Sequence, residues 1–132
     1  MVHGKGGVLG PDLSRVGASR SIAYLIDSIR EPNKDLSDGM LDPNNHYGLP
    51  LVYDTVIVIL KNGENVTGVA SNEDTFSIQL IDGAQHLRLF QKGELKSVRH
   101  EHKSLMPAYS ETVIGAKDLE DLLAYLASLH GR

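Results

Sequence analysis

The 132-residue sequence contains no cysteine and no tryptophan. Because thiols are absent, disulfides, zinc–thiolate sites, iron–sulfur clusters and thiol catalysis are excluded for this chain. No apolar run approaches the roughly 20 residues that a helix needs to cross a bilayer, so we expect no membrane segment. The first seven residues also lack the apolar stretch of a secretory signal. Two alternatives follow: a cytoplasmic protein, or a chain whose natural beginning lies upstream.

Basic charge is scarce as well. The 13 Lys and Arg residues are outnumbered by 17 Asp and Glu, which gives a formal net charge of −4. A protein that binds nucleic acid non-specifically usually presents a basic face, so we expect no nucleic-acid partner. The apolar content of 41% is that of an ordinary globular protein, and the length predicts a single hydrophobic core.

Two stretches have helical periodicity. Near the N-terminus, apolar residues recur with the spacing of one helix face, at Ile22, Leu25, Ile26 and Ile29. Ser19 or Ser21 can cap this helix and Pro32 bounds it, so we expect it to span about 19–30. Near the C-terminus an apolar stripe predicts a second helix, with Gly115 at its cap and Asp118 in its first turn; the stripe contains Leu119, Leu122, Leu123, Leu126 and Leu129.

Between these helices the pattern is that of a β-sheet. Residues 31–50 are rich in proline, glycine, Asn and Asp, which favours loops. Five short strands follow, the first ending at the hairpin signal Asn62-Gly63; they are Val56–Leu60, Val66–Ala70, Phe76–Leu80, Leu87–Phe90 and Leu95–Val98. The fold class is therefore α+β. A helical core made of residues 1–50 and 104–132 is interrupted by a five-stranded antiparallel β insertion, residues 51–103.

Two segments outside the helices and strands carry candidate chemistry. The first is the glycine-rich stretch from Gly4 to Leu13, where the backbone could approach a ligand closely; the alternative is a flexible terminus. The second is Met106-Pro107, between the last strand and the last helix. A thioether is a soft ligand that can bind haem iron, and the proline would hold it in an extended loop. The alternative role for this methionine is to fill a gap in the core.

Four motifs occur in one order along the chain: Gly6-Gly7-Val8-Leu9-Gly10-Pro11-Asp12-Leu13, Ser28-Ile29-Arg30-Glu31-Pro32-Asn33, Ser104-Leu105-Met106-Pro107 and Asp121-Leu122-Leu123-Ala124-Tyr125-Leu126. In this order they resemble the class I c-type cytochromes. In particular, the chain resembles bacterial haem-binding domains that carry a β-rich insertion before the methionine loop, often as the C-terminal part of larger dehydrogenase-like proteins. The resemblance implies a cytochrome c-like helical core, haem c as cofactor, and electron transfer without bond-making catalysis. It also implies a periplasmic location and a redox partner protein or a fused dehydrogenase domain.

The resemblance also implies roles for individual residues. Met106 would be the distal ligand of the haem iron, with Pro107 shaping its loop. Pro11 would pack by the proximal imidazole, and Gly10 and Leu13 would line the haem. The last helix would pack on the haem edge or on a first helix through Leu122, Leu123 and Leu126.

One part of the family pattern is absent. These proteins attach haem through Cys-x-x-Cys-His, and family spacing places that segment at or just before Met1. Either the start codon is assigned at an internal methionine or the protein is a haem-free descendant; we favour the first, because a descendant without haem has no evident reason to keep Met106-Pro107. The chain as given should bind no haem covalently. His3 is a candidate substitute ligand, and the alternative is a solvent-exposed terminal histidine.

Three further expectations follow. Without a first helix, the last helix should expose apolar residues and favour self-association. The exposed residues should include some of Leu119, Leu122, Leu126 and Leu129. His100-Glu101-His102 could present two imidazoles on one face of a strand, but no third metal ligand is visible nearby, so a polar strand end is the better interpretation. We treat His46, His86 and His130 as surface residues.

The strand block permits another function class: a haem-free SH3- or Sm-like β-barrel that binds protein or RNA.

Overall fold

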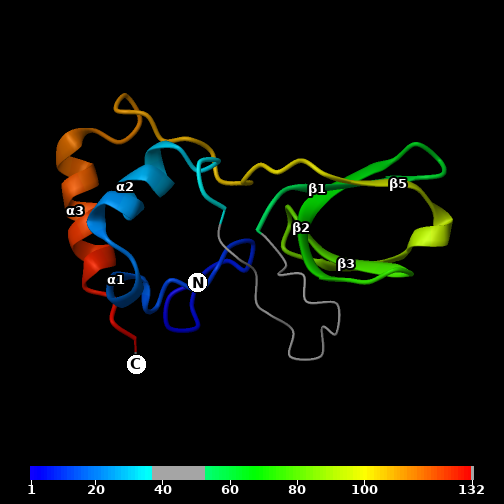
Figure 1. Ribbon diagram of the computed structural model, residues 1–132, viewed down its shortest axis with the longest axis horizontal. Helices are drawn as coiled ribbons and strands as arrows, with labels where there is room; N and C mark the ends of the chain where they lie inside the picture. The colour runs from blue at the N-terminus through cyan, green and yellow to red at the C-terminus, as the bar shows by residue number, and fades with distance from the viewer. Residues whose placement is uncertain (37–52, 132) are drawn as a thin grey trace. The chain divides into compact units, whose positions relative to one another are not determined.

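The computed structural model describes residues 1–36 and 53–131, so His46 lies outside the described residues. The chain divides into two compact units (Figure 1). The helical unit consists of Met1–Asp35 and Met106–Arg132, and the β unit consists of Leu36–Leu105. The expectation of a single core is therefore wrong: length alone did not show that the inserted strands form a body of their own. The unit boundaries fall at 35/36 and 105/106, where we expected 50/51 and 103/104.

The helical unit contains α1 (Val16–Ser19), α2 (Ile22–Arg30) and α3 (Ala116–Ala127). Ser21 caps α2, because its hydroxyl oxygen accepts a hydrogen bond from the Tyr24 N–H at 3.2 Å. Leu25 and Ile29 are buried on one face of this helix. The predicted helix over about 19–30 is thus confirmed over Ile22–Arg30, with Ser21 as its cap, while Ser19 instead ends α1.

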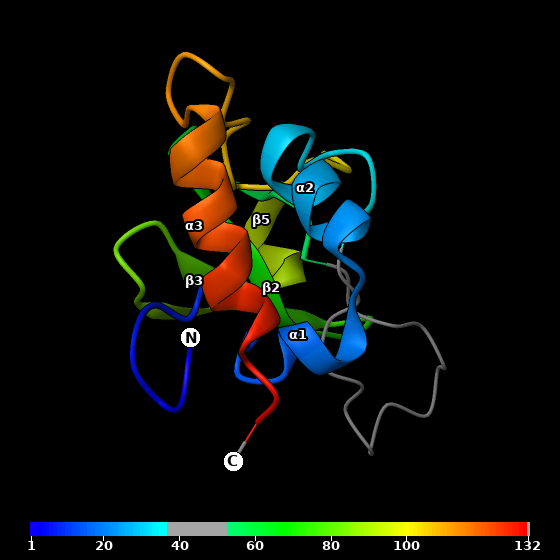
Figure 2. The same cartoon turned by 90° about the vertical axis from the view of Figure 1, so that its left-hand side faces the viewer.

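The short helix α1 was not predicted, and α3 contacts both α1 and α2 (Figure 2). Gly17 permits the contact with the C-terminal segment: a Cβ at this position would lie 2.3 Å from the Ala127 carbonyl oxygen. The Gly17 N–H also donates a hydrogen bond to the Leu129 carbonyl oxygen at 2.9 Å. Leu129 is buried, so it is not among the leucines that the C-terminal segment exposes; the chain turns back on α1 at this point.

The β unit is a five-stranded antiparallel sheet, as predicted. Its strands are β1 (Val56–Leu60), β2 (Asn65–Glu73), β3 (Ser77–Asp82), β4 (Leu87–Gln91) and β5 (Leu95–His100), with a 3-10 turn, η1 (Lys92–Glu94), before β5. The strand order is β4-β3-β2-β1-β5. Among the described residues no pairing joins β4 to β5, so the sheet is open and these two strands are its edges.

Alternating residues of the central strands form the hydrophobic core of the β unit. The fully covered side chains are Val56, Val58, Ile78 and Leu80, together with the nearly covered Val66. Aspartates close the turns on either side of β3: the Asp74 carboxylate accepts hydrogen bonds from two backbone N–H groups, and so does that of Asp82. Two register shifts, one in β1–β5 and one in β2–β3, bend the sheet.

None of the described helices is both long enough and apolar enough to span a membrane.

Candidate functional site

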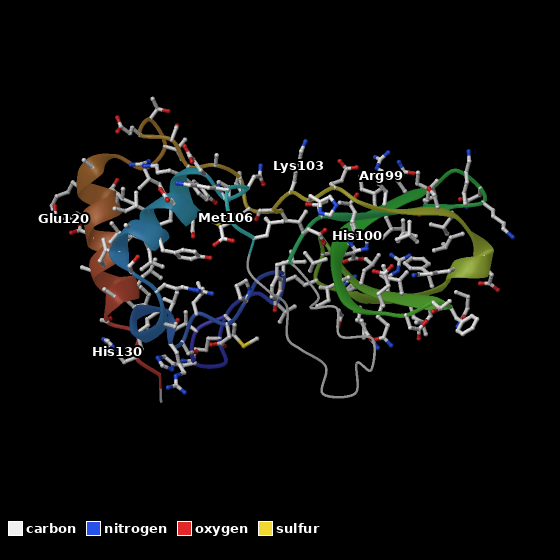
Figure 3. The ribbon with its side chains drawn as sticks, viewed as in Figure 1. Arg99, His100, Lys103, Met106, Glu120 and His130 are labelled. Atoms are coloured by element: carbon white, nitrogen blue, oxygen red, sulfur yellow. The ribbon has the colours of Figure 1, made fainter. Side chains whose placement is uncertain are left out.

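The structure brings the two predicted haem-binding segments into one compact unit, although about 90 residues separate them. Gly10 is exposed, while Pro11 and Leu13 are half-buried, and the Leu13 N–H donates to the Met1 carbonyl oxygen at 2.8 Å. Met106 and Pro107 belong to the chain segment that follows β5 and precedes α3. Met106 is 40% exposed (Figure 3). Met106 is therefore not a buried core filler, and its side chain is accessible to a ligand.

Haem c requires two thiols, a proximal histidine and a distal ligand. The chain has no cysteine, and the described residues include no group of three or more His, Cys, Asp or Glu that could hold a metal ion. Met106 carries a thioether, which is a suitable donor for the distal position, and Pro11 and Leu13 are half-buried. The residue types of this chain therefore fit a distal ligand, and the chain has no thiols for attachment.

His3 lies in a tight turn at the N-terminus, where its backbone is left-handed, with φ +48°. Its N–H donates to the Ser14 hydroxyl oxygen at 2.7 Å. The ring borders an open hollow of about 570 Å³ in the helical unit, together with Asp12, Arg15 and His130. His3 and His130 are both exposed, which confirms the surface assignment of His130. The role of His3 as a substitute haem ligand stays a prediction.

The apolar stripe of α3 is only partly covered. No residue of this helix is buried. The half-exposed leucines are Leu119, Leu122, Leu123 and Leu126, while the neighbouring Tyr125 is 53% exposed. An amphipathic helix normally buries its apolar face. The stripe on α3 therefore has room to pack against a further apolar surface.

A polar cluster in the β unit was not found from the sequence. Asp54, which precedes β1, is 3% exposed, and both of its carboxylate oxygens lie 3.2 Å from His100 Nδ1. His100 Nε2 lies 2.8 Å from the Glu73 carboxylate at the end of β2. Glu73 also pairs with Lys92 Nζ, at 2.9 Å. The cluster thus joins the start of β1, the ends of β2 and β5, and η1.

Two opposing effects act on the His100 imidazole (Figure 3). Burial of the ring lowers its pKa, but hydrogen bonds to Asp54 and Glu73 and the charges of these carboxylates outweigh burial and raise the pKa of His100 above its ordinary 6.5. The protonated ring donates from both nitrogens. The cluster therefore holds a positive charge between two negative ones, which stabilises the ends of three strands.

The sequence placed His100 correctly at a polar strand end, because β5 ends there. It gave no sign of the two carboxylate partners, which lie 46 and 27 residues away. The signal that could have identified Asp54 is its position, a carboxylate two residues before the most apolar strand. His102 has left-handed backbone and an exposed ring, and its Nδ1 lies 3.8 Å from the same Asp54 carboxylate.

No family model matches the sequence, and no curated protein matches it. The fold class is α+β, with a five-stranded antiparallel sheet inserted between helices. The functional assignment therefore rests on the four sequence motifs and on the arrangement of their residues.

Proposed function

We propose that the helical unit is the haem-binding, electron-transfer domain of a c-type cytochrome in the complete protein, with Met106 as the distal iron ligand. The observation that carries the proposal is the joining of the glycine-rich loop, α2, the Met106 segment and α3 in one compact unit across an inserted β unit. Three of the four cytochrome-like motifs fall wholly within this unit, and the fourth contributes Met106 and Pro107 to it. A cytochrome c-like core needs these motifs together, whatever lies between them in sequence.

The residues of this chain would act by binding and shaping rather than by bond-making catalysis. A bound haem would supply one-electron chemistry, and methionine ligation raises its reduction potential, which suits electron acceptance from a dehydrogenase partner or fused dehydrogenase domain. Met106 would present its sulfur to the iron from an extended loop that Pro107 restricts. Gly10, Pro11 and Leu13 would line the opposite part of the site. A periplasmic location belongs to the same proposal.

The stripe on α3 supports this assignment. Leu122, Leu123 and Leu126 are half-exposed, although the helix is amphipathic. Burying such side chains gains about 25 cal/mol for each Å² of apolar surface removed from water. A haem edge or an additional helix would remove this surface from water. In the chain as given, the same stripe favours self-association, which is the earlier prediction for this helix.

The proposal requires two thiols and a proximal histidine from residues outside these 132. Translating the DNA immediately upstream of Met1, in the same reading frame, tests this directly. An in-frame Cys-x-x-Cys-His ending at or next to Met1 would support the assignment. An in-frame stop codon at that point would refute it and leave a haem-free protein.

Replacing Met106 with alanine in the complete protein should leave the covalently bound haem in place and abolish the low-spin His/Met spectrum. The reason is that the thioether bonds hold the haem whether or not the distal ligand is present. Leu105→Ala is the matched control, since Leu105 is the neighbouring residue and is 37% exposed against 40% for Met106. A wild-type absorption spectrum in the Met106→Ala protein would sink the assignment of Met106.

The β unit supports a second candidate function, that of an SH3- or Sm-like interaction module. Its bent sheet and the 3-10 turn between β4 and β5 are compatible with such a barrel. Three large apolar side chains on this unit are strongly exposed, namely Phe76, Leu87 and Leu89. Saturable binding of RNA or peptide by the haem-free chain, lost on substitution of these side chains, would favour this candidate over electron transfer.

A further inference from the structure

The outer edge of β4 carries backbone groups that no described strand pairs with. The Asp82 N–H donates to the His86 carbonyl oxygen at 3.0 Å, and the Lys92 N–H donates to the Phe76 carbonyl oxygen at 2.7 Å. In an antiparallel ladder every second residue pair is hydrogen-bonded. Between these two bonds, Arg88 and Phe90 therefore point their backbone groups toward β3. The residues whose N–H and C=O groups point away from β3 are Leu87, Leu89 and Gln91.

The side chains of this edge are apolar where soluble proteins usually place a charge. Leu87 and Leu89 lie on the same sheet face and are 62% and 59% exposed. Natural edge strands are usually protected by a charge, a proline or a bulge. The one charged side chain of β4, Arg88, lies on the opposite face and pairs with Asp82 at 3.5 Å. On the sheet face that carries Leu87 and Leu89, β4 therefore has no charged side chain that would repel a second strand.

We propose that two copies of this protein pair through β4, antiparallel, about a two-fold axis at Leu89. The two strands can form hydrogen bonds only where residues whose backbone groups point away from β3 lie opposite each other. Within β4, this condition is met when the two-fold axis passes through Leu87, Arg88, Leu89, Phe90 or Gln91. A centre on Arg88 opposes two arginines, and a centre on Phe90 brings Arg88 against Lys92. Like charges directly opposite each other are destabilising. Centres on Leu87 or Gln91 align only one end of each strand.

The Leu89-centred register has complementary neighbours. Its pairs are Leu89 with Leu89, Leu87 with Gln91, and Arg88 with Phe90. The first two pairs are hydrogen-bonded, because their backbone groups face each other. Arg88 already lies over the Phe90 ring of its own chain at 5.6 Å, and in the dimer it also faces the Phe90 ring of the second copy. The two-fold axis places Leu87 and Leu89 of both copies on the same face of the combined sheet, where they form a continuous apolar row.

The absence of cysteine makes the register directly measurable in the 132-residue chain. In the proposed dimer the two Leu89 Cα atoms lie about 5.5 Å apart. The two Leu87 Cα atoms lie four residues apart along the strand direction, about 13 Å. Leu89→Cys should therefore give a covalent dimer with a short reagent that carries two thiol-reactive alkylating groups, and Leu87→Cys, which is about equally exposed, should not. A mixture of Leu87→Cys and Gln91→Cys chains should cross-link. Equal cross-linking of the two single variants would overturn the register.

Sedimentation equilibrium tests the association itself. Leu89→Lys and Leu89→Glu should each weaken the dimer roughly tenfold or more, because a charge then faces its own copy across the axis. An equimolar mixture of the two should restore dimerisation. Val113→Lys, an equally exposed apolar position in the helical unit, should leave it unchanged. A monomeric wild-type chain, or association that is equally strong in the wild-type and Leu89→Lys chains, would overturn the proposal.

Discussion

Replacing Ile78 with alanine is expected to lower the free energy of unfolding of the β unit by about 3 kcal/mol, within the range for truncating a buried isoleucine. Ile78 is 0% exposed and belongs to the core cluster formed by β1, β2 and β3. Its removal leaves a cavity in the core, and the pairing of β3 with both β4 and β2 limits collapse into that cavity.

The same substitution at Ile81 is the matched control. Ile81 lies in the same strand but on the opposite sheet face, where it is half-buried. Ile81→Ala should cost about 1 kcal/mol or less, because less apolar surface leaves contact with the protein. Hydrogen exchange of the β3 and β1 amides reports the opening of this unit separately from the helical unit. Equal losses at both positions would show that the core does not lie where the structure places it.

Local patterns were enough to predict the strands. The run Val56–Leu60 ending at Asn62-Gly63 predicted β1 and its hairpin, and β1 spans those residues. Alternation and turn residues likewise predicted β3 and β4, because aspartate side chains form the turns within a few residues of themselves. Periodicity and capping predicted α2 and α3 for the same reason: each signal lies within one helix.

Contacts between distant segments could not be predicted in this way. β5 lies beside β1 rather than beside β4, and sequence order gives no sign of it. Leu129 is buried because Gly17 allows the C-terminal segment to approach α1, a contact that joins the two ends of the chain. The carboxylates around His100 come from two other segments. For the proposed haem site, the sequence supplied the residue types, and the structure adds that the segments carrying them belong to one unit.

The β unit should be more stable at about pH 6 than at about pH 8, because protonation of His100 is linked to folding. Its pKa is raised in the folded protein above the ordinary 6.5. The stabilisation is therefore fully present below the unfolded-state pKa and is lost as the pH rises through the folded-state pKa. Urea unfolding at the two pH values, followed through the methyl signals of the core valines, measures the difference. A folded-state titration of the His100 ring by NMR gives the pKa itself.

Asp54→Asn should lower the free energy of unfolding at about pH 6 by about 2 kcal/mol, since it removes a hydrogen bond between charged groups at a buried carboxylate. It should also reduce the difference between the two pH values, because the asparagine no longer favours the protonated ring. Glu101→Gln is the control: Glu101 is next to His100 in sequence, but it pairs with the exposed Arg99. That surface pair contributes about 0.5 kcal/mol or less, and its loss should leave the pH dependence intact. If Asp54→Asn and Glu101→Gln had the same pH profile, the stabilisation would not come from the pairing of His100 with Asp54.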